Sequence, residues 1–345
     1  MKTARLDGLM PAPAGRSARS PRVVALGGGT GLPIVLRGLK AALFPAGPTA
    51  GQRDRLTAIV TVADDGGSSG RLRQAYRMLA PGDIRNCLLA LADDHPTLAA
   101  LFAFRFNGHG DVSGHSLGNL ILTALAQMEA DFTGGVARAA DLLGVNGRVL
   151  PATLDDVTLV AELADGRVVR GESQIAVGRE GIRRVWLQPA ARALPAAREA
   201  IETADVVVLG PGSLYTSLIP VLLVEELAAA LGRTSARVVL VANVMTEPGE
   251  TDGYALADLL VAIQRHAPAA RIDDVVVNTA AIRPAVRERY AAHGAMPVAV
   301  DQPVLRRLGY RPLAGDFLAA GAKVRQDPDR LAWAILHVAA ERAAR

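Results

Sequence analysis

Two adjacent carboxylates, Asp64 and Asp65, open the densest run of polar and small residues in the chain. The residues that follow them are Gly66, Gly67, Ser68, Ser69, Gly70 and Arg71. Carboxylates in such a loop can hold a hard cation such as Mg²⁺, bind sugar hydroxyls, or orient the acceptor of a transfer reaction. The alternative is a solvated surface loop built on Asx turns. We favour a functional loop, because a plain turn rarely contains so many special residues.

Two glycine-rich turns, at residues 27–31 and 210–213, offer a different chemistry, the binding of anions. Each follows a short apolar run and precedes a helical pattern, which presents backbone N–H groups and a helix N-terminus to a phosphate. Leu32 stands where the dinucleotide fingerprint has its third glycine, and no P-loop lysine follows. Taken alone, the first turn therefore fits a phosphate cradle and a tight turn that binds nothing about equally well.

A third cluster, at residues 81–86, opens a predicted helix. Asp83 stands near its start, where a capping residue is expected. Arg85 and Asn86 could reach a phosphate, and a solvated first turn explains them equally well.

His115, Ser116 and Asn119 span about one helical turn ahead of the apolar helix predicted over residues 120–128, so we expect their side chains to converge. A Ser-His-acid hydrolase is disfavoured, because the chain has no G-x-S-x-G elbow. We favour His115 as a hydrogen-bond donor to a ligand. Zinc binding with His109 is disfavoured, since no cysteine or third histidine lies nearby.

A recurring order of strand, polar loop and helix predicts how these clusters are positioned. Buried strands are predicted at residues 23–26, 56–63, 206–209, 238–242, 275–278 and 298–301. Helices are predicted at residues 32–44, 98–106, 195–203 and 213–231, with a last one from residue 327. This pattern indicates an α/β, Rossmann-like, doubly wound and mostly parallel sheet with helices on both faces. Ligands of such sheets bind at the carboxyl ends of the strands. Residues 149–188 read instead as an antiparallel β excursion on one side of the sheet.

Length and composition bound the class of protein. The chain has 345 residues, half of them hydrophobic, which is enough for a full globular core. Its single cysteine, Cys87, excludes an intrachain disulfide and lies in an apolar run as an inert thiol. No run is long enough to span a membrane, and residues 1–21 lack the apolar region of a signal peptide. We expect a cytoplasmic protein.

The positive charge is confined to one end of the chain. Residues 1–22 carry five basic residues and one acidic residue, which equals the net charge of +4 of the whole chain. The remaining residues are therefore formally neutral, which argues against nucleic-acid binding. We predict a basic, disordered tail at residues 1–21 and a single domain at residues 22–340.

Six ordered motifs resemble the YvcK-type gluconeogenesis-factor family, which shares the CofD-like fold of 2-phospho-lactate transferases. They lie at residues 27–31, 63–71, 81–86, 113–119, 210–217 and 243–254. The resemblance runs from residue 23 to residue 339 and implies a Rossmann-like protein that binds a UDP-sugar, notably UDP-N-acetylglucosamine. The implied role is in cell shape and wall-precursor supply during gluconeogenic growth. A homodimer is compatible with the sequence, which does not fix the oligomeric state.

The resemblance also implies the ligand-binding residues, with the glycine turns around the pyrophosphate and Tyr290 and Arg325 near the nucleoside or sugar. These residues are Gly28, Gly29, Thr30, Gly31, Asp64, Asp65, Gly66, Gly67, Ser68, Ser69, Arg71, Arg85, Asn86, His115, Ser116, Asn119, Gly212, Ser213, Tyr215, Thr216, Ser217, Asn243, Thr246, Asp252, Tyr254, Tyr290 and Arg325. One departure is Gln326, which stands where the family has a histidine.

Three functions follow, and one experiment separates the first two. The first is a UDP-sugar-binding regulator that needs no cofactor. The second is a CofD-like transferase, with Asp64 and Asp65 as candidate catalytic residues and ligands of Mg²⁺. Asparagine at both positions should spare binding in a regulator and abolish activity in a transferase. The third, an NAD-dependent dehydrogenase, is disfavoured because the acid at residue 64 lies too far beyond the first turn.

Overall fold

The computed structural model describes residues 4–5, 20–47, 51–93, 95–175 and 180–343. Most of the predicted basic tail lies outside these residues. Within its described residues, Ala4–Arg5 forms the short strand β1.

The sequence predicts a mostly parallel main sheet, and every pairing among its described strands is parallel. Its strands are β1, β2 (Val23–Gly27), β3 (Leu56–Val60), β4 (Arg148–Pro151), β8 (Val206–Leu209), β9 (Arg237–Val241), β10 (Asp274–Asn278) and β11 (Arg311–Gly315). Their order in space is β1-β11-β10-β9-β8-β2-β3-β4. The chain leaves β2 towards β3 and β4, then returns to β8 on the other side of β2. The strand order therefore reverses between β2 and β8, where α/β sheets form their ligand crevice.

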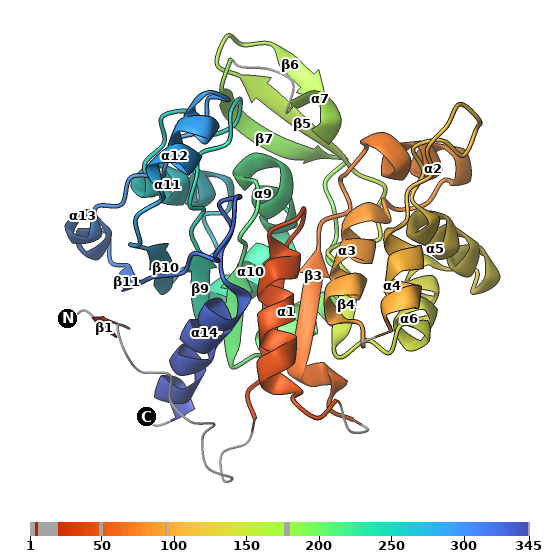
Figure 1. Cartoon of the computed structure of the whole chain (residues 1–345), viewed down its shortest axis with the longest axis horizontal. Helices are drawn as coiled ribbons and strands as arrows, with labels where there is room; N and C mark the ends of the chain where they lie inside the picture. Colours follow the sequence, from red (N-terminus) through yellow and green to blue (C-terminus); the bar gives the residue numbers. More distant parts are fainter. Residues whose placement is uncertain (1–3, 6–19, 48–50, 94, 176–179, 344–345) are drawn as a thin grey trace.

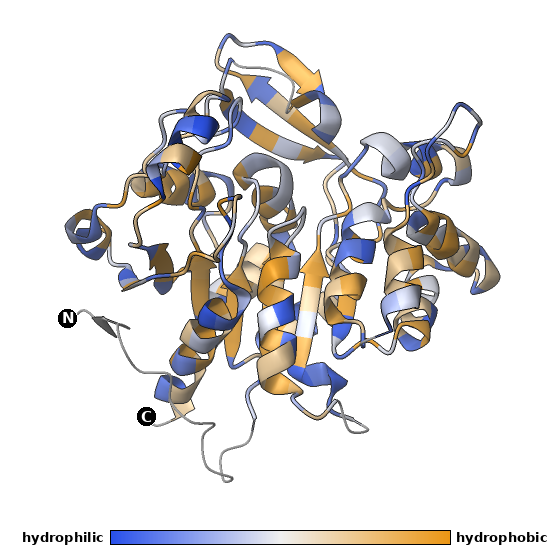
Figure 2. Ribbon diagram, viewed as in Figure 1, coloured by the Kyte–Doolittle hydropathy of each residue, from blue (hydrophilic) through white to orange (hydrophobic). Residues whose placement is uncertain are grey.

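Alternate residues of the central strand face opposite layers of helices. Val23 and Ala25 pack among residues of α1, α3 and α14, whereas Val24 and Leu26 pack among residues of α8, α10 and α11. The first layer is α1 (Leu32–Leu43), α3 (Gly82–Leu91) and α14 (Pro328–Ala343); the second is α8 (Pro195–Glu202), α10 (Glu225–Arg233) and α11 (Leu256–His266). Figure 2 shows the continuous hydrophobic strands between these layers, which explains their runs of apolar residues.

Most of the remaining helices lie towards the two edges of the sheet (Figure 1). On the side of β4 they are α2 (Gly67–Tyr76), α4 (Pro96–Ala103), α5 (Leu117–Met128) and α6 (Phe132–Leu142). On the side of β10 and β11 they are α12 (Pro284–Ala291) and α13 (Gln302–Arg307). A 3₁₀ turn, Arg53–Arg55, leads into β3.

The antiparallel excursion is confirmed, but it begins later than predicted. Its sheet has the order β6-β5-β7, from β5 (Thr158–Leu163), β6 (Val168–Arg170) and β7 (Ile182–Gln188). Figure 1 shows it above the carboxyl ends of the parallel strands, with the one-turn helix α7 (Glu172–Ile175) beside it. The segment from residue 148 to residue 151 is β4, which pairs in parallel with β3 and so belongs to the main sheet.

Two predicted elements are wrong. Residues 298–301 form no strand of the sheet, because Val298 donates its backbone N–H to Val244 and Ala299 accepts from Leu256. The helix predicted over residues 213–231 is broken into a π-helical turn (Leu214–Leu218), α9 (Ile219–Leu222) and α10. The π turn and Pro220 account for the break.

No single described helix is long and apolar enough to cross a membrane, although the bent pair Leu214–Leu222 and Glu225–Arg233 passes by length and composition together.

Candidate functional site

The two glycine turns lie against each other at the point where the strand order reverses. A Cβ atom at Gly31 would overlap the carbonyl oxygen of Pro211, and one at Gly212 would lie 3.4 Å from the carbonyl oxygen of Gly28. Gly29 has a φ of +62°, a conformation that side chains disfavour. Glycine is therefore needed for the close approach of the turns, which brings the ends of β2 and β8 into one site.

Asp83 binds the backbone of the first turn. The prediction that it caps its own helix is wrong. Its carboxylate accepts a hydrogen bond from the N–H of Gly29 at 2.7 Å, whereas the start of α3 has no side-chain cap. Burial raises the pKa of Asp83 to about 6; the Gly29 bond opposes this rise and the charge of Asp64 adds to it. A protein carboxylate thus already holds one of the N–H groups predicted to cradle a phosphate.

Glu250 does the same at the second turn. Its carboxylate accepts from the backbone N–H of Tyr215 at 3.1 Å and from the hydroxyl of Thr216 at 2.9 Å. Burial raises the pKa of Glu250 to about 7, and the neighbouring Glu247 adds to the rise. The start of the broken helix is therefore also occupied by an internal acid.

A cavity of about 360 Å³ opens beside the two turns, at the carboxyl ends of β8 and β9. It gathers predicted ligand-binding residues from five separate segments of the chain. These residues are Thr30, Gly31, Gly212, Ser213, Asn243, Thr246, Tyr290 and Arg325. These residues lie far apart in the sequence and meet at one cavity in the structure.

Two of these side chains hold the walls of the cavity in place. The hydroxyl of Tyr290 accepts a hydrogen bond from the backbone N–H of Val324 at 3.0 Å, which fixes the segment carrying Arg325. The hydroxyl of Thr246 accepts from the N–H of Met296 at 2.9 Å and is buried. Thr246 therefore positions the loop, whereas Arg325 keeps its guanidinium for other contacts.

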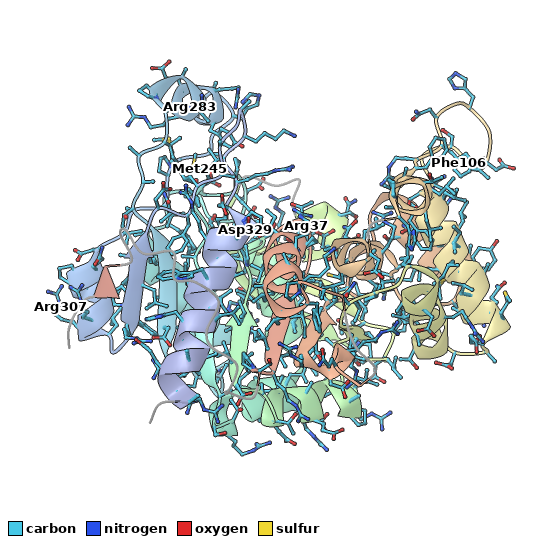
Figure 3. The ribbon with its side chains drawn as sticks, turned by 60° about the horizontal axis from the view of Figure 1, so that its bottom comes forward. Arg37, Phe106, Met245, Arg283, Arg307 and Asp329 are labelled. Atoms are coloured by element: carbon cyan, nitrogen blue, oxygen red, sulfur yellow. The ribbon has the colours of Figure 1, made fainter. Side chains whose placement is uncertain are left out.

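A second arginine, Arg37 of α1, stands near Arg325 and was not predicted. Partial burial and the charge of Arg325 lower the pKa of Arg37. Neither guanidinium makes a hydrogen bond or ion pair to another residue that the structure describes. Helices α1 and α14 approach so closely at Gly38 that a Cβ atom there would overlap the carbonyl of Pro328. Figure 3 shows Arg37 near Asp329 at the start of α14. Two neighbouring cations without anionic partners suit a bound anion.

The two carboxylates of the acidic loop after β3 bind different segments of the chain. The carboxylate of Asp65 accepts from the N–H of Ser173 at 2.9 Å, in the antiparallel excursion, and that of Asp64 accepts from the N–H of Gly66 at 2.8 Å. Glu172, which lies beside Ser173, completes an acidic group that sequence reasoning missed. Burial, followed by the charges of Asp64, Asp83 and Asp65, raises the pKa of Glu172 to about 8.

These acids do not fit the Mg²⁺ ion that the transferase hypothesis requires. Within the described part of the chain, no three His, Cys, Asp or Glu side chains are arranged to hold a metal ion. The carboxylate of Asp65 is directed to the backbone of α7. We therefore derive no step through a metal.

His115 and Asn119 converge on Ser68, as their spacing predicts. The Ser68 oxygen accepts from the side-chain amide of Asn119 at 3.1 Å and from the N–H of Ser116 at 3.3 Å. Its own hydrogen must then point to Nδ1 of His115, 3.0 Å away. This arrangement gives His115 its proton on Nε2, and burial, followed by the charges of nearby arginines, lowers its pKa. Ser68 orients a neutral histidine and is not an activated nucleophile.

Arg85 and Asn86 are engaged with their own surroundings. The guanidinium of Arg85 donates to the side-chain oxygens of Asn119 and Asn86, each at 2.8 Å. The hydroxyl of Ser116 donates to the carbonyl of Phe102 at 3.3 Å. This network links α3 to α5, although the buried Nε of Arg85 has no hydrogen-bond partner among the described residues.

Several other predicted residues lie outside the cavity. Tyr215 is buried, and its hydroxyl lies 3.0 Å from that of Tyr254. Asp252 accepts from the N–H of Gly249 within its own turn. The full set that does not line the cavity is Gly28, Gly29, Asp64, Asp65, Gly66, Gly67, Ser68, Ser69, Arg71, Arg85, Asn86, His115, Ser116, Asn119, Tyr215, Thr216, Ser217, Asp252 and Tyr254.

Comparisons with known proteins agree with this architecture. The family described as 2-phospho-L-lactate transferase CofD matches residues 23–318. A protein of Halalkalibacterium halodurans named gluconeogenesis factor is 43% identical over 92% of this chain and 96% of its own length. The gluconeogenesis factor of Bacillus subtilis is 44% identical over 84% of this chain and 89% of its own length. A crystal structure of a Bacillus halodurans protein has a TM-score of 0.86 at 43% identity and covers 92% of this chain and all of that one.

Proposed function

The chain belongs to the CofD family, and we propose that it is a regulatory protein that binds a UDP-sugar of the UDP-N-acetylglucosamine type. The ligand lies in the cavity beside the two glycine turns. Its diphosphate lies between Arg325 and Arg37, and binding needs no metal ion.

The convergence of residues on this cavity carries the proposal. Thr30 supplies a hydroxyl group and Arg325 supplies charge from a distant segment. The side-chain amide of Asn243 donates to the carbonyl of Gly212 at 3.0 Å and so fixes the wall between them. Guanidinium groups bind phosphate oxygens in a planar, bidentate manner and strengthen each bond by their charge. A diphosphate with two negative charges would also relieve the repulsion between the two arginines.

The regulatory role rests on relatives that bear the name gluconeogenesis factor at 40–46% identity. We propose that the protein acts in the cytoplasm and supports cell shape and the supply of wall precursors during gluconeogenic growth. A UDP-linked amino sugar is a precursor of the wall, so a protein that binds it could report on that supply.

Isothermal titration of the full chain tests the proposal. The ligands are UDP-N-acetylglucosamine, UDP-glucose, GDP and NAD, each with and without Mg²⁺. We expect micromolar binding of a UDP-sugar that does not change when Mg²⁺ is omitted. Binding of GDP only in the presence of metal, or breakdown of the ligand during titration, would favour a CofD-like transferase instead. Binding of NAD alone would contradict both.

A further inference from the structure

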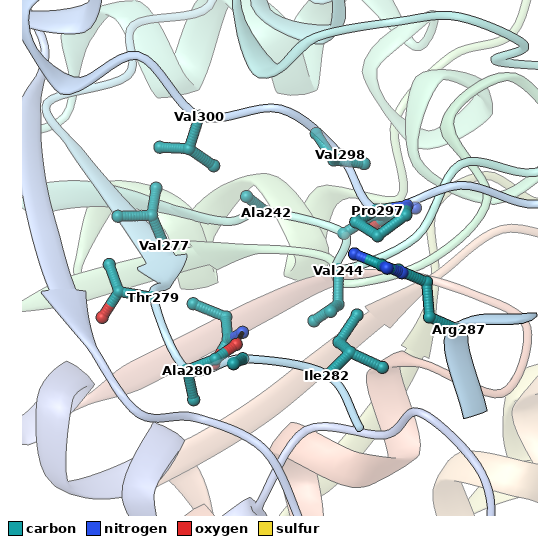
Figure 4. Close-up of a pocket in the computed structure, with 13 residues that line it drawn as sticks. Ala242, Val244, Val277, Thr279, Ala280, Ile282, Arg287, Pro297, Val298 and Val300 are labelled. Atoms are coloured by element: carbon teal, nitrogen blue, oxygen red, sulfur yellow. Dashed lines mark hydrogen bonds between the residues drawn. The ribbon is translucent and has the colours of Figure 1, made fainter. Parts of the chain in front are cut away.

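A second cavity, of about 240 Å³, lies beside the first, and the two share Asn243 and Val244 in their walls. It lies at the carboxyl ends of β9 and β10, between residues 279–282, α12 and the segment 297–300 (Figure 4). Asn243 is the only residue in its lining that the sequence predicted as ligand-binding.

The exposed lining of this cavity is about equally polar and apolar, but most of its side chains are apolar. They include Ala242, Val244, Val277, Ile282, Pro297, Val298 and Val300. The uncharged polar side chains of the lining are already engaged. Asn278 donates to the carbonyl of Ala280 at 2.9 Å and accepts from the N–H of Phe317 at 3.0 Å, and Thr279 donates to the carbonyl of Gly315 at 3.2 Å.

Arg287 of α12 is the one charged side chain in the lining. It makes no hydrogen bond or ion pair to another described residue. Figure 4 shows it extending from α12 towards Pro297 and Val244. The backbone N–H groups of Ala280 and Ala281, in the same lining, also have no acceptor among the described residues. A planar guanidinium stacks on aromatic rings, and N–H groups donate to ring carbonyls.

We propose that this second cavity, named here the base pocket, takes the planar heteroaromatic base of the nucleotide. The inference rests on the proposed function, because the diphosphate and sugar would then lie in the first cavity. The shared wall at Asn243 and Val244 makes the two cavities neighbours, as the two ends of one elongated ligand require. The ring lies against the valine and isoleucine side chains, with Arg287 over it.

The chemistry of the lining favours a base over a sugar. A sugar carries several hydroxyl groups, and each loses free energy if it is buried without a partner. The engaged side chains of Asn278 and Thr279 cannot supply those partners, whereas apolar side chains suit the faces of a flat ring. A base needs partners only at its edge, where the free N–H groups lie.

Two substitutions test the base pocket in the full chain. Ile282→Trp fills it with a bulky ring, and Arg287→Ala removes the stacking group from an exposed position, so that the fold is kept. The matched controls are Val261→Trp and Arg307→Ala, since Val261 is 50% exposed on α11 and Arg307 lies on α13. Thermal melting of every variant confirms folding.

The measurement is titration with UDP-N-acetylglucosamine, with inorganic pyrophosphate as a competitor. We expect both base-pocket variants to bind the UDP-sugar at least about tenfold more weakly than wild type. The affinity for pyrophosphate, derived from the competition, should be unchanged in these variants. Both control variants should bind the UDP-sugar as tightly as wild type. Wild-type affinity for the UDP-sugar in folded Ile282→Trp and Arg287→Ala proteins would overturn the inference alone, as would an equal loss for pyrophosphate. Failure of the wild type to bind any nucleotide would overturn the proposed function and this inference together.

Discussion

The two halves of the carboxyl edge of the sheet differ in how their polar groups are satisfied. Beyond β3, the carboxylates of Asp65 and Asp83 accept hydrogen bonds from backbone N–H groups of Ser173 and Gly29. Beyond β8 and β9, Arg325 faces a cavity and makes no polar contact to another described side chain. We call these the acidic half and the arginine half.

A dense polar motif is therefore not by itself a binding surface. A polar group costs free energy when it is buried without a partner, so packed motifs form hydrogen bonds among themselves. The acidic half follows this rule, since backbone N–H groups donate to the carboxylates of Asp65 and Asp83. In the arginine half, Arg37 and Arg325 are exposed to solvent, so the rule does not require a protein partner and both side chains stay available to a ligand.

The largest expected effect on stability and binding concerns the contact between Gly31 and Pro211, where the two glycine turns meet. Gly31→Ala places a methyl group against the carbonyl of Pro211 and forces the two turns apart. We expect a loss of about 1–3 kcal/mol in unfolding free energy and a UDP-sugar affinity too weak to measure. Gly110→Ala is the control, because a Cβ atom there meets nothing within 4 Å. Urea unfolding and titration measure both quantities; equal behaviour of the two variants would contradict the role of the contact.

The next effect is specific to the arginine half. Arg325→Ala and Arg37→Ala each remove a charged donor from the diphosphate, and we expect about 10- to 100-fold weaker binding of UDP-N-acetylglucosamine. Thermal stability should stay at the wild-type value, because neither side chain is tied to the protein. Arg307→Ala, on the far helix α13, should bind normally. Retention of full affinity by both arginine variants would place the diphosphate elsewhere.

A smaller effect concerns Asp83, whose buried carboxyl has a pKa of about 6. The folded state holds this proton more tightly than the unfolded state, so wild-type stability falls as pH rises from about 4 to about 6. Asp83→Asn keeps an acceptor for the N–H of Gly29 but carries no charge. We expect the variant to be more stable than wild type by about 2 kcal/mol at pH 7.5, with almost no difference at pH 4.

Urea unfolding at the two pH values measures this difference in unfolding free energy between the variant and wild type. A difference of the same size at both pH values would mean that Asp83 is ionised in the folded protein without loss of stability.

The smallest effect should come from the acids that the sequence makes most prominent. The double variant Asp64→Asn and Asp65→Asn should bind the UDP-sugar within about threefold of wild type, because neither side chain lines the cavity. Loss of binding would move the ligand to the acidic half. Titration with and without Mg²⁺ also shows whether any affinity depends on metal.

The sequence predicted the parallel sheet and the convergence of its loops, because period and glycine turns are local signals. It also predicted that His115 and Asn119 meet. It could not predict Arg37, because the close approach of α1 to α14 at Gly38 is a tertiary contact. Nor could it show that Asp83 and Glu250 cover the N–H groups of the turns, since these pairs are 54 and 35 residues apart. Long-range satisfaction of polar groups decides which motif stays open, and no local pattern encodes it.

The most direct test is a crystal structure of the full chain grown with UDP-N-acetylglucosamine and Mg²⁺. We expect diphosphate density within hydrogen-bond distance of the guanidinium groups of Arg325 and Arg37, with the uracil ring beside Arg287. Density for the diphosphate and a metal ion against Asp64 and Asp65 would contradict this placement.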